Sequence, residues 1–307
     1  MSLALGLDEG SGPLVVLLHG FPEGPESWHH QVPPLVADGY RVVAPHLRGY
    51  GDSPAPTDPE QYTADLLADD VAGVIEDCGE DQAVVIGHDW GAAVTWAAAE
   101  LRPDRVRAMA ALSVPFTARS RRPPLERLAE VAGGNFFYML YFNEPDGRAE
   151  RELGADVAAF LLGMYAAASG EPPPGAFAPL RRGASMLDQL VAPESWPAWL
   201  DREVFSRAVD RFTAHGFTGP LNYYRAMDLS WERVPAYGAA PVTCPALFLA
   251  GAKDMVLAFT PTRAMAPPLV TDLRVDLRVA DAGHWVQQEA AEQVTAALRA
   301  FLAGLAR

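Results

Sequence analysis

The chain has little cysteine, little positive charge and no long apolar run. Two cysteines among 307 residues provide neither a disulfide framework nor a zinc site, and are typical of a reducing compartment. The 24 basic and 39 acidic residues leave a formal net charge of −15, which disfavours nucleic acids and anionic membranes as partners. The apolar runs are strand-sized, far below the roughly 20 residues of a membrane span. We therefore expect a cytoplasmic protein whose partner is a small neutral molecule.

The sequence also lacks the patterns of metal and nucleotide sites. His29 and His30 are adjacent, which is not the spacing of metal ligands, and no glycine-rich phosphate loop occurs. We therefore expect neither a metal nor a cofactor. The cluster Arg119, Arg121 and Arg122 is interpreted as a solvated loop. The sequence does not decide between a monomer and a homodimer.

Half of the residues are hydrophobic, and they follow the pattern of an α/β protein. Strand-like runs alternate with helical patterns, which indicates a mostly parallel sheet flanked by helices. The runs are residues 14–18, 41–44, 83–86, 107–112, 246–250 and 273–279. Amphipathic spacing predicts helices over residues 62–78 and 294–305. The segment before Leu14 is short and has room for one strand.

The middle of the chain has a different composition. Between residues 115 and 241 the strand signals fade, and aromatic residues, prolines and helical patterns replace them. We interpret residues 116–240 as an inserted helical cap, and residues 1–115 and 241–307 as one α/β core. An insertion at this point lies over the carboxyl ends of the strands, where sites of such sheets form. We expect the cap and the core to enclose the active site.

The most specific motif is the segment Gly87-His88-Asp89-Trp90-Gly91, which stands between a strand-like run and a helix-prone run. Its flanking glycines allow a sharp, strained turn that exposes the central side chain at the end of the sheet, as in a nucleophile elbow. That side chain is the carboxyl group of Asp89, which can attack an electrophilic carbon and form an alkyl ester. The dipole of the following helix favours a negative charge there. We expect Asp89 to be the nucleophile.

An acid and a histidine follow in the chain order that such a nucleophile requires. Asp254 comes after the run 246–250, and His284 comes after the run 273–279. Because carboxylates are ordinarily ionised near neutral pH, His284 is not needed to deprotonate Asp89. Its expected role is to activate water against the ester, while Asp254 orients the ring and stabilises the imidazolium. Asp281 is the alternative acid.

A second turn, His19-Gly20-Phe21-Pro22, directly follows the run 14–18. A turn at this place can present a backbone N–H to a developing oxyanion. We expect the N–H groups of Phe21 and Trp90 to form the oxyanion hole, each contributing roughly 3 kcal/mol in comparable sites. The side chains of Phe21 and Trp90 are expected to line the substrate pocket.

These motifs resemble those of the epoxide hydrolases with the α/β-hydrolase fold, and the resemblance covers nearly the whole chain. In that family two cap tyrosines bind the epoxide oxygen and protonate the leaving alkoxide. Residues 136–145 and 219–225 are similar to the two tyrosine regions. The resemblance therefore implies that Tyr138 and Tyr224 bind substrate and donate protons, with Tyr141 as the runner-up and Tyr223 as a structural residue. Phenols suit this role because they stay protonated at physiological pH.

The function implied is conversion of an epoxide to a vicinal diol through an alkyl ester on Asp89, hydrolysed by water that His284 activates. A haloalkane dehalogenase is one alternative, since its core is similar. Such enzymes commonly have an asparagine where this chain has Phe21, which offers no side-chain donor, so only Trp90 is left to contact a halide. A non-catalytic small-molecule receptor is the other alternative. The intact set of Asp89, Asp254 and His284 argues against it.

Overall fold

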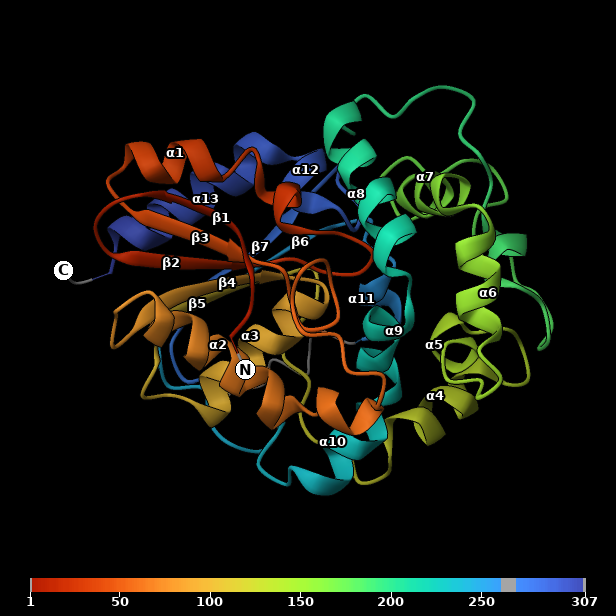
Figure 1. Ribbon diagram of the computed structural model, residues 1–307, viewed down its shortest axis with the longest axis horizontal. Coiled ribbons are helices and arrows are strands. Elements are labelled where there is room, and N and C mark those ends of the chain that lie inside the picture. Colours follow the sequence, from red (N-terminus) through yellow and green to blue (C-terminus); the bar gives the residue numbers. More distant parts are fainter. Residues whose placement is uncertain (1, 261–268, 306–307) are drawn as a thin grey trace.

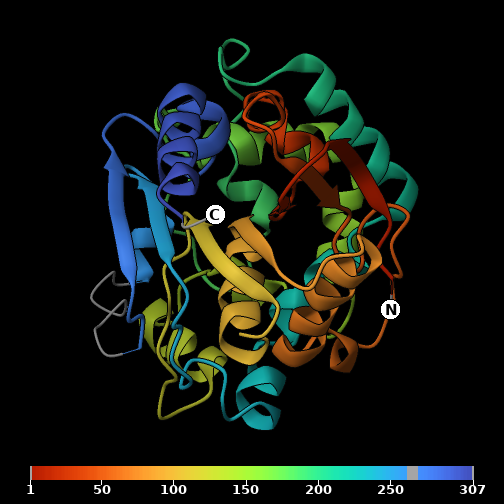
Figure 2. The same ribbon diagram turned by 90° about the vertical axis from the view of Figure 1, so that its left-hand side faces the viewer.

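The computed structural model describes residues 2–260 and 269–305. In this part of the chain seven strands form one sheet in the order β1-β3-β2-β4-β5-β6-β7. β1 pairs antiparallel with β3, and the other pairs are parallel. Figure 2 shows the sheet with β1 and β7 at its opposite edges. The strands are β1 (Leu5–Gly10), β2 (Leu14–Leu18), β3 (Arg41–Pro45), β4 (Ala83–His88), β5 (Val106–Leu112), β6 (Ala246–Gly251) and β7 (Leu273–Val279).

The predicted α/β fold with a mostly parallel sheet is confirmed. The six predicted strands are β2 to β7, with small differences at their ends. β1 is the one strand for which the amino-terminal segment has room, and it extends the sheet beyond β3. β2, β4 and β6 are buried along their whole length, because helices cover both faces of the sheet.

Helices on the two faces form two hydrophobic cores. α1 (Val32–Ala37) and α13 (Ala291–Ala303) lie on one face, and α2 (Ala64–Asp77) and α3 (Trp90–Leu101) lie on the other (Figure 1). The predicted helices over 62–78 and 294–305 correspond to α2 and α13, which bury the expected apolar stripes. The short elements are η1 (Pro25–Trp28), η2 (Pro59–Tyr62), η3 (Met186–Gln189), α11 (Val256–Phe259) and α12 (Val286–Glu289).

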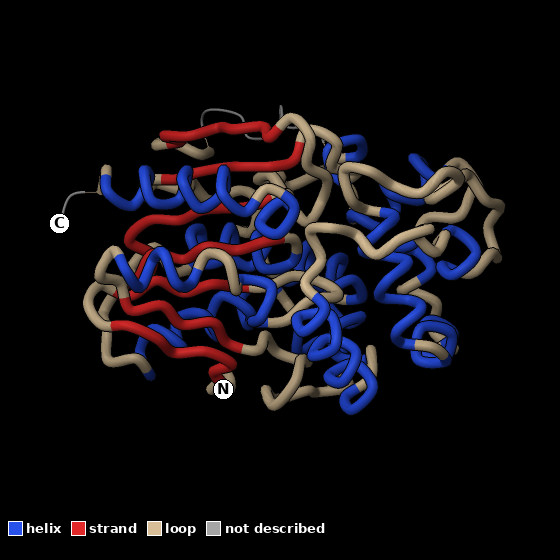
Figure 3. Tube along the Cα trace, turned by 90° about the horizontal axis from the view of Figure 1, so that it is seen from above, coloured by secondary structure: helices blue, strands red, loops and turns tan. Residues whose placement is uncertain are grey.

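Helices α4 to α10 are inserted between β5 and β6 and lie beside one end of the sheet (Figures 1 and 3). Residues of α5, α9 and α10 share a pocket with Asp89, which follows β4, so this is the carboxyl end of β4. The exact limits of the cap, 116 and 240, stay a prediction. No helix in the described part of the chain has the length and apolarity needed to cross a membrane. The inserted helices are α4 (Pro124–Ala132), α5 (Tyr138–Tyr141), α6 (Arg148–Ala155), α7 (Val157–Ala167), α8 (Arg202–His215), α9 (Thr218–Arg225) and α10 (Met227–Arg233).

Candidate active site

Asp89 lies in the sharp turn between β4 and α3. Its backbone has φ 51° and ψ −117°, a conformation that is strained for a residue with a side chain. The turn needs glycine at both flanks: a Cβ on Gly87 would lie 2.1 Å from the carbonyl oxygen of Gly91, and a Cβ on Gly91 would lie 2.1 Å from that of Leu18. The glycines thus allow the close packing that exposes Asp89 at the end of the sheet.

One predicted oxyanion donor contacts Asp89 directly. The backbone N–H of Phe21, in the turn after β2, donates a hydrogen bond to Asp89 Oδ1 at 2.8 Å. Trp90 is the first residue of α3, so its N–H is among the amides that lack a partner within the helix. Both groups therefore belong to the polar surroundings of Asp89, and their role as an oxyanion hole stays a prediction.

Loops after β6 and β7 bring Asp254 and His284 together beside Asp89. His284 Nε2 lies 3.5 Å from Asp89 Oδ2, and His284 Nδ1 lies 3.1 Å from Asp254 Oδ1. Burial disfavours the imidazolium, but the two carboxylates more than offset it and hold the pKa of His284 well above its usual range. Burial also opposes the charge on Asp254, yet the imidazole and its hydrogen-bond donors lower the pKa of that carboxyl overall. The three groups have the order and spacing of a catalytic triad.

Ser113 is a member of this site that the sequence analysis missed. Its hydroxyl donates a hydrogen bond to Asp254 Oδ2 at 2.5 Å, and its Oγ lies 2.8 Å from His284 Nδ1. Ser113 directly follows β5, is fully buried and has φ 74°. A hydroxyl that donates to the carboxylate keeps lone pairs that can accept a hydrogen bond from the ring N–H. Ser113 therefore helps to hold Asp254 and His284 in place relative to each other. The one sequence signal that could have pointed to Ser113 is its position directly after a strand-like run, at the same end of the sheet as Asp89.

The loop that carries His284 is held from both sides. The backbone N–H of His284 donates to the carbonyl oxygen of Ala168, just after α7, at 2.9 Å. Glu289 of α12 accepts the N–H groups of Gly283 and Trp285, at 3.1 and 3.0 Å. The ring of His88 lies 2.8 Å from the carbonyl oxygen of His284. The inserted segment and the core therefore both fix the imidazole.

The alternative acid, Asp281, is not in this site. The side chain of Asp281 is 95% exposed, and its nearest cation is Lys253 Nζ at 3.5 Å. Asp254, by contrast, is buried against the imidazole. The structure thus places Asp254, not Asp281, beside His284.

Two tyrosines of the inserted helices line the pocket that contains Asp89. Tyr138 comes from α5 and Tyr224 from α9, and their ring centroids are 6.0 Å apart. Burial, and then the negative charge of Asp89, raise the pKa of both phenols well above the usual value. Both hydroxyls therefore stay protonated near neutral pH and can donate a hydrogen bond. Their role as proton donors stays a prediction.

The other two tyrosines of these segments have hydroxyl groups that are engaged elsewhere. Tyr141 donates to Glu152 Oε2 at 2.7 Å and does not line the pocket. Tyr223 lines the pocket with its ring, but its hydroxyl donates to the carbonyl oxygen of Arg48 at 2.9 Å. The geometry therefore favours Tyr138 over Tyr141 and Tyr224 over Tyr223.

Phe21 and Trp90 differ in how their side chains are placed. The Phe21 ring is buried in a cluster of aromatic rings that includes Phe142 and Tyr224, each with its centroid 5.6 Å away. Trp90 lines the pocket, and its ring meets Tyr224 edge to face at 5.0 Å. The Phe21 ring packs against Phe142 and Tyr224 and is not among the described residues of the pocket wall, whereas its N–H contacts Asp89. Its part in substrate binding stays a prediction. Within residues 2–260 and 269–305, no group of three metal-binding side chains lies close enough to hold an ion.

Comparison with known proteins agrees with this geometry. Residues 13–291 match the family model of the alpha/beta hydrolase fold. Epoxide hydrolase A of Mycobacterium tuberculosis is 43% identical over 302 residues, which cover 97% of this chain and 92% of that protein. An epoxide hydrolase of Caballeronia sordidicola is 36% identical and covers 96% of this chain and 89% of its own.

Solved structures agree as well. The crystal structure of epoxide hydrolase A from Mycobacterium thermoresistibile is 46% identical, with a TM-score of 0.91 over 97% of this chain and 94% of that one. An epoxide hydrolase from an endophytic Streptomyces is 37% identical, with a TM-score of 0.92 over 97% and 91% of the two chains. The chain therefore belongs to the epoxide hydrolases of the α/β-hydrolase-fold family.

Proposed function

We propose that this protein hydrolyses an epoxide to a vicinal diol through an alkyl ester on Asp89. The observation that carries the proposal is the composition of one pocket. Its wall includes the Asp89 carboxylate together with Tyr138 and Tyr224 of the inserted helices, and His284 stands 3.5 Å from Asp89. The names of the relatives support this function over a dehalogenase or a receptor. The buried ring and missing side-chain donor of Phe21 also speak against halide binding.

The first step is attack on one ring carbon. Because Phe21 N–H holds Oδ1, Oδ2 of Asp89 is the oxygen that forms the new C–O bond. The carbon–oxygen bond of the ring breaks, and its electron pair goes to the ring oxygen. Tyr138 or Tyr224 gives its proton to that oxygen, so the leaving group is a neutral hydroxyl rather than a strongly basic alkoxide. The products of this step are the ester and a tyrosinate.

The second step is hydrolysis of the ester. Esterification removes the charge of Asp89, one of the two carboxylates that raise the pKa of His284, so the imidazolium gives up its proton more readily. That proton goes to the tyrosinate left by ring opening, which restores the phenol and leaves a neutral imidazole that can act as a base. Water gives a proton to His284, and the hydroxide adds to the ester carbon, whose oxyanion lies at the N–H groups of Phe21 and Trp90. Collapse expels the second diol oxygen. The imidazolium proton goes to the leaving diol oxygen, and the carboxyl proton of Asp89 returns to His284, which restores the starting carboxylate and imidazolium.

A single turnover in heavy-oxygen water tests the covalent route. With unlabelled enzyme in excess over epoxide, the first diol is expected to contain no label, because both of its oxygens come from the epoxide and from Asp89. The label enters the Asp89 carboxyl group instead and appears in diol in later turnovers. Mass spectrometry of the diol and of the peptide with Asp89 measures both. Diol labelled in the first turnover would mean that water attacks the epoxide directly.

Removal of either pocket phenol is expected to slow ring opening. Tyr138→Phe and Tyr224→Phe should each lower kcat/KM by roughly 10²-fold, the usual contribution of a general acid, and the double variant by more. Tyr141→Phe is the matched control, because its hydroxyl donates to Glu152 and is not in the pocket. It should change kcat/KM by less than about twofold. Steady-state kinetics on one epoxide compares the variants, and equal effects at positions 138 and 141 would refute the assignment.

The proposal needs only an epoxide and water as partners, and it places the reaction in the cytoplasm. The two cysteines, Cys78 and Cys244, are both free thiols, as is typical of a reducing compartment. The acidic net charge of −15 supports neither a nucleic acid nor an anionic membrane as a partner.

A further inference from the structure

The carboxyl end of α7 is bound to the loop that carries His284. The carbonyl oxygen of Tyr165 accepts a hydrogen bond from the indole N–H of Trp285 at 2.9 Å, and that of Ala168 accepts the N–H of His284, also at 2.9 Å. The ring of Tyr165 meets the indole of Trp285 nearly edge to face, with the centroids 4.9 Å apart. This end of an inserted helix is therefore a fixed neighbour of the imidazole.

The side chain of Tyr165 also reaches the turn that follows β2. Its hydroxyl donates a hydrogen bond to the carbonyl oxygen of Pro22 at 2.8 Å. Tyr165 is buried, and this burial, together with the negative charges of Glu23 and Glu26, raises the pKa of its phenol well above the usual value. The phenol therefore keeps its proton near neutral pH and donates the bond to Pro22 in every step of the reaction.

Pro22 directly follows Phe21, the residue whose N–H contacts Asp89 Oδ1 at 2.8 Å. The two residues form the middle of a four-residue turn, which is closed by a hydrogen bond from the N–H of Glu23 to the carbonyl oxygen of Gly20 at 3.0 Å. In so short a turn the peptide groups cannot rotate independently of one another. A partner that holds the carbonyl group of Pro22 therefore also limits the movement of the Phe21 N–H.

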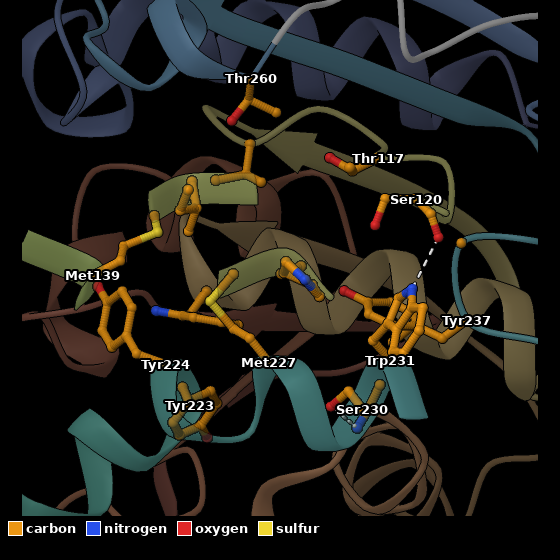
Figure 4. Close-up of a pocket in the computed structure, with 18 of the residues that line it drawn as sticks. Thr117, Ser120, Met139, Tyr223, Tyr224, Met227, Ser230, Trp231, Tyr237 and Thr260 are labelled. Carbon is orange, nitrogen blue, oxygen red and sulfur yellow. Dashed lines mark hydrogen bonds between the residues drawn. The ribbon is translucent and has the colours of Figure 1, made fainter. Parts of the chain in front are cut away.

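Tyr165 itself lies outside the substrate pocket. Figure 4 shows Tyr223 and Tyr224 of α9 among the residues of the pocket wall, and Tyr165 is not among the described residues of that wall. Its ring lies instead near the rings of Trp199 and Phe205, with centroids 6.5 and 6.3 Å away. Any effect of Tyr165 on the reaction must therefore act through the groups that it holds in place.

The two groups that Tyr165 links are needed together in only one of the two proposed steps. In ring opening the negative charge leaves Asp89, so the hydrogen bond from Phe21 N–H to Oδ1 weakens during this step and does not accelerate it. In hydrolysis, negative charge develops at the ester oxygen that faces Phe21 N–H, while His284 takes a proton from the attacking water. Poor alignment of these two groups therefore slows hydrolysis and leaves ring opening nearly unchanged.

We infer that Tyr165 is a positioning residue for ester hydrolysis, because it ties the turn of Phe21 to the loop of His284 on the two sides of Asp89. Its hydroxyl holds the turn, and its backbone and ring hold the loop. This inference deepens the proposed function and rests on it. The inserted segment then serves both steps: α5 and α9 supply the two tyrosines of the pocket for ring opening, and α7 aligns the groups for hydrolysis.

Tyr165→Phe tests this role, because it removes the hydroxyl and keeps the ring. The protein is saturated with 1,2-epoxyhexane and quenched in acid, and intact-protein mass spectrometry measures the ratio of esterified to free protein. This ratio should rise roughly 5-fold or more, the size of effect of one lost hydrogen bond, because the ester forms as before and is hydrolysed more slowly. The kcat/KM for the epoxide should stay within about twofold, since it reports ring opening. Loss of folded protein would instead lower kcat/KM and leave the ratio unchanged.

Tyr141→Phe is the matched control, because Tyr141 is also a buried phenol of the inserted helices whose hydroxyl donates one hydrogen bond outside the pocket, to Glu152. It should leave both the ester ratio and kcat/KM within about twofold. An unchanged ester ratio in Tyr165→Phe, or a fall of its kcat/KM as large as the rise of the ratio, would overturn the inference. Ester on the unchanged protein would still uphold the proposed function.

If no ester forms on the unchanged protein, the proposed function fails, and amide hydrogen exchange then decides separately whether Tyr165 positions the turn. In NMR measurements the Phe21 N–H should exchange roughly 5-fold or more faster in Tyr165→Phe, while the amides of β4 keep their rates. An unchanged rate at Phe21 would show that the hydroxyl does not hold the turn. Faster exchange along β4 as well would show general destabilisation, and either result would overturn the inference.

Discussion

Asp89→Asn is expected to lower kcat/KM for every epoxide by roughly 10⁴-fold or more. An uncharged amide is a poor nucleophile, so the alkyl ester does not form. The amide oxygen can still accept the hydrogen bond that Phe21 N–H donates to Asp89 Oδ1 at 2.8 Å, and the turn should keep its shape. Steady-state kinetics on a terminal alkyl epoxide measures the loss, and a thermal melt checks that the variant is folded.

The matched control for this variant is Asp281→Asn, which removes a carboxylate of the His284 loop that is 95% exposed. It should leave kcat/KM within about twofold, as expected for a surface substitution. The same control tests the alternative assignment of the triad acid. Retention of more than about 1% of activity by a folded Asp89→Asn protein would contradict nucleophilic attack by this residue.

The central strands could be predicted because a strand that is buried on both faces of the sheet has apolar residues along its whole length. β2 reads LVVLL and β6 reads ALFLAG, continuous apolar runs that fit a parallel sheet between two layers of helices. β1 reads LGLDEG, is mostly exposed and carries no such signal. It forms because the edge of β3 offers unpaired backbone groups, which any neighbouring extended segment can satisfy. Only the space available before Leu14 pointed to it.

The triad could be proposed from chain order, but its geometry depends on loops. Asp254 was preferred as the acid because it follows the strand-like run 246–250, with Asp281 as the alternative, and the burial of the two side chains now separates them. Ser113 was missed because a single serine after a strand matches no motif. Its contacts with Asp254 and His284 form only when the ends of β5, β6 and β7 are adjacent in the sheet.

The substrate pocket was the least predictable part. The tyrosine regions could be matched by resemblance, whereas the length of the pocket depends on how α4 and α10 pack over α3. Arg127 lies only a few residues from the arginine cluster 119–122, and the sequence analysis treated that cluster as a solvated loop. The fold instead places Arg119 and Arg127 in the pocket wall and leaves Arg121 exposed. Tertiary packing, which local patterns do not encode, made this distinction.

His284→Gln is expected to stop the reaction after one equivalent of epoxide has reacted. Asp89 keeps its charge and its contact with Phe21, so the ester still forms, but no base remains to activate water. Hydrolysis of the ester should slow by roughly 10³-fold or more, which is the size of effect that general base catalysis contributes. Intact-protein mass spectrometry should then show one added substrate mass per chain, and digestion should place it on the peptide that contains Asp89.

His215→Gln is the matched control for this arrest, because His215 is exposed at the end of α8, outside the pocket wall. It should turn over epoxide normally and carry no adduct. A His284→Gln protein that consumes epoxide without gaining mass would show that the histidine acts before the ester forms. A variant that consumes none would show that the imidazole is needed for the attack itself. Only accumulation of the ester agrees with a histidine that becomes a base once the charge of Asp89 has been removed.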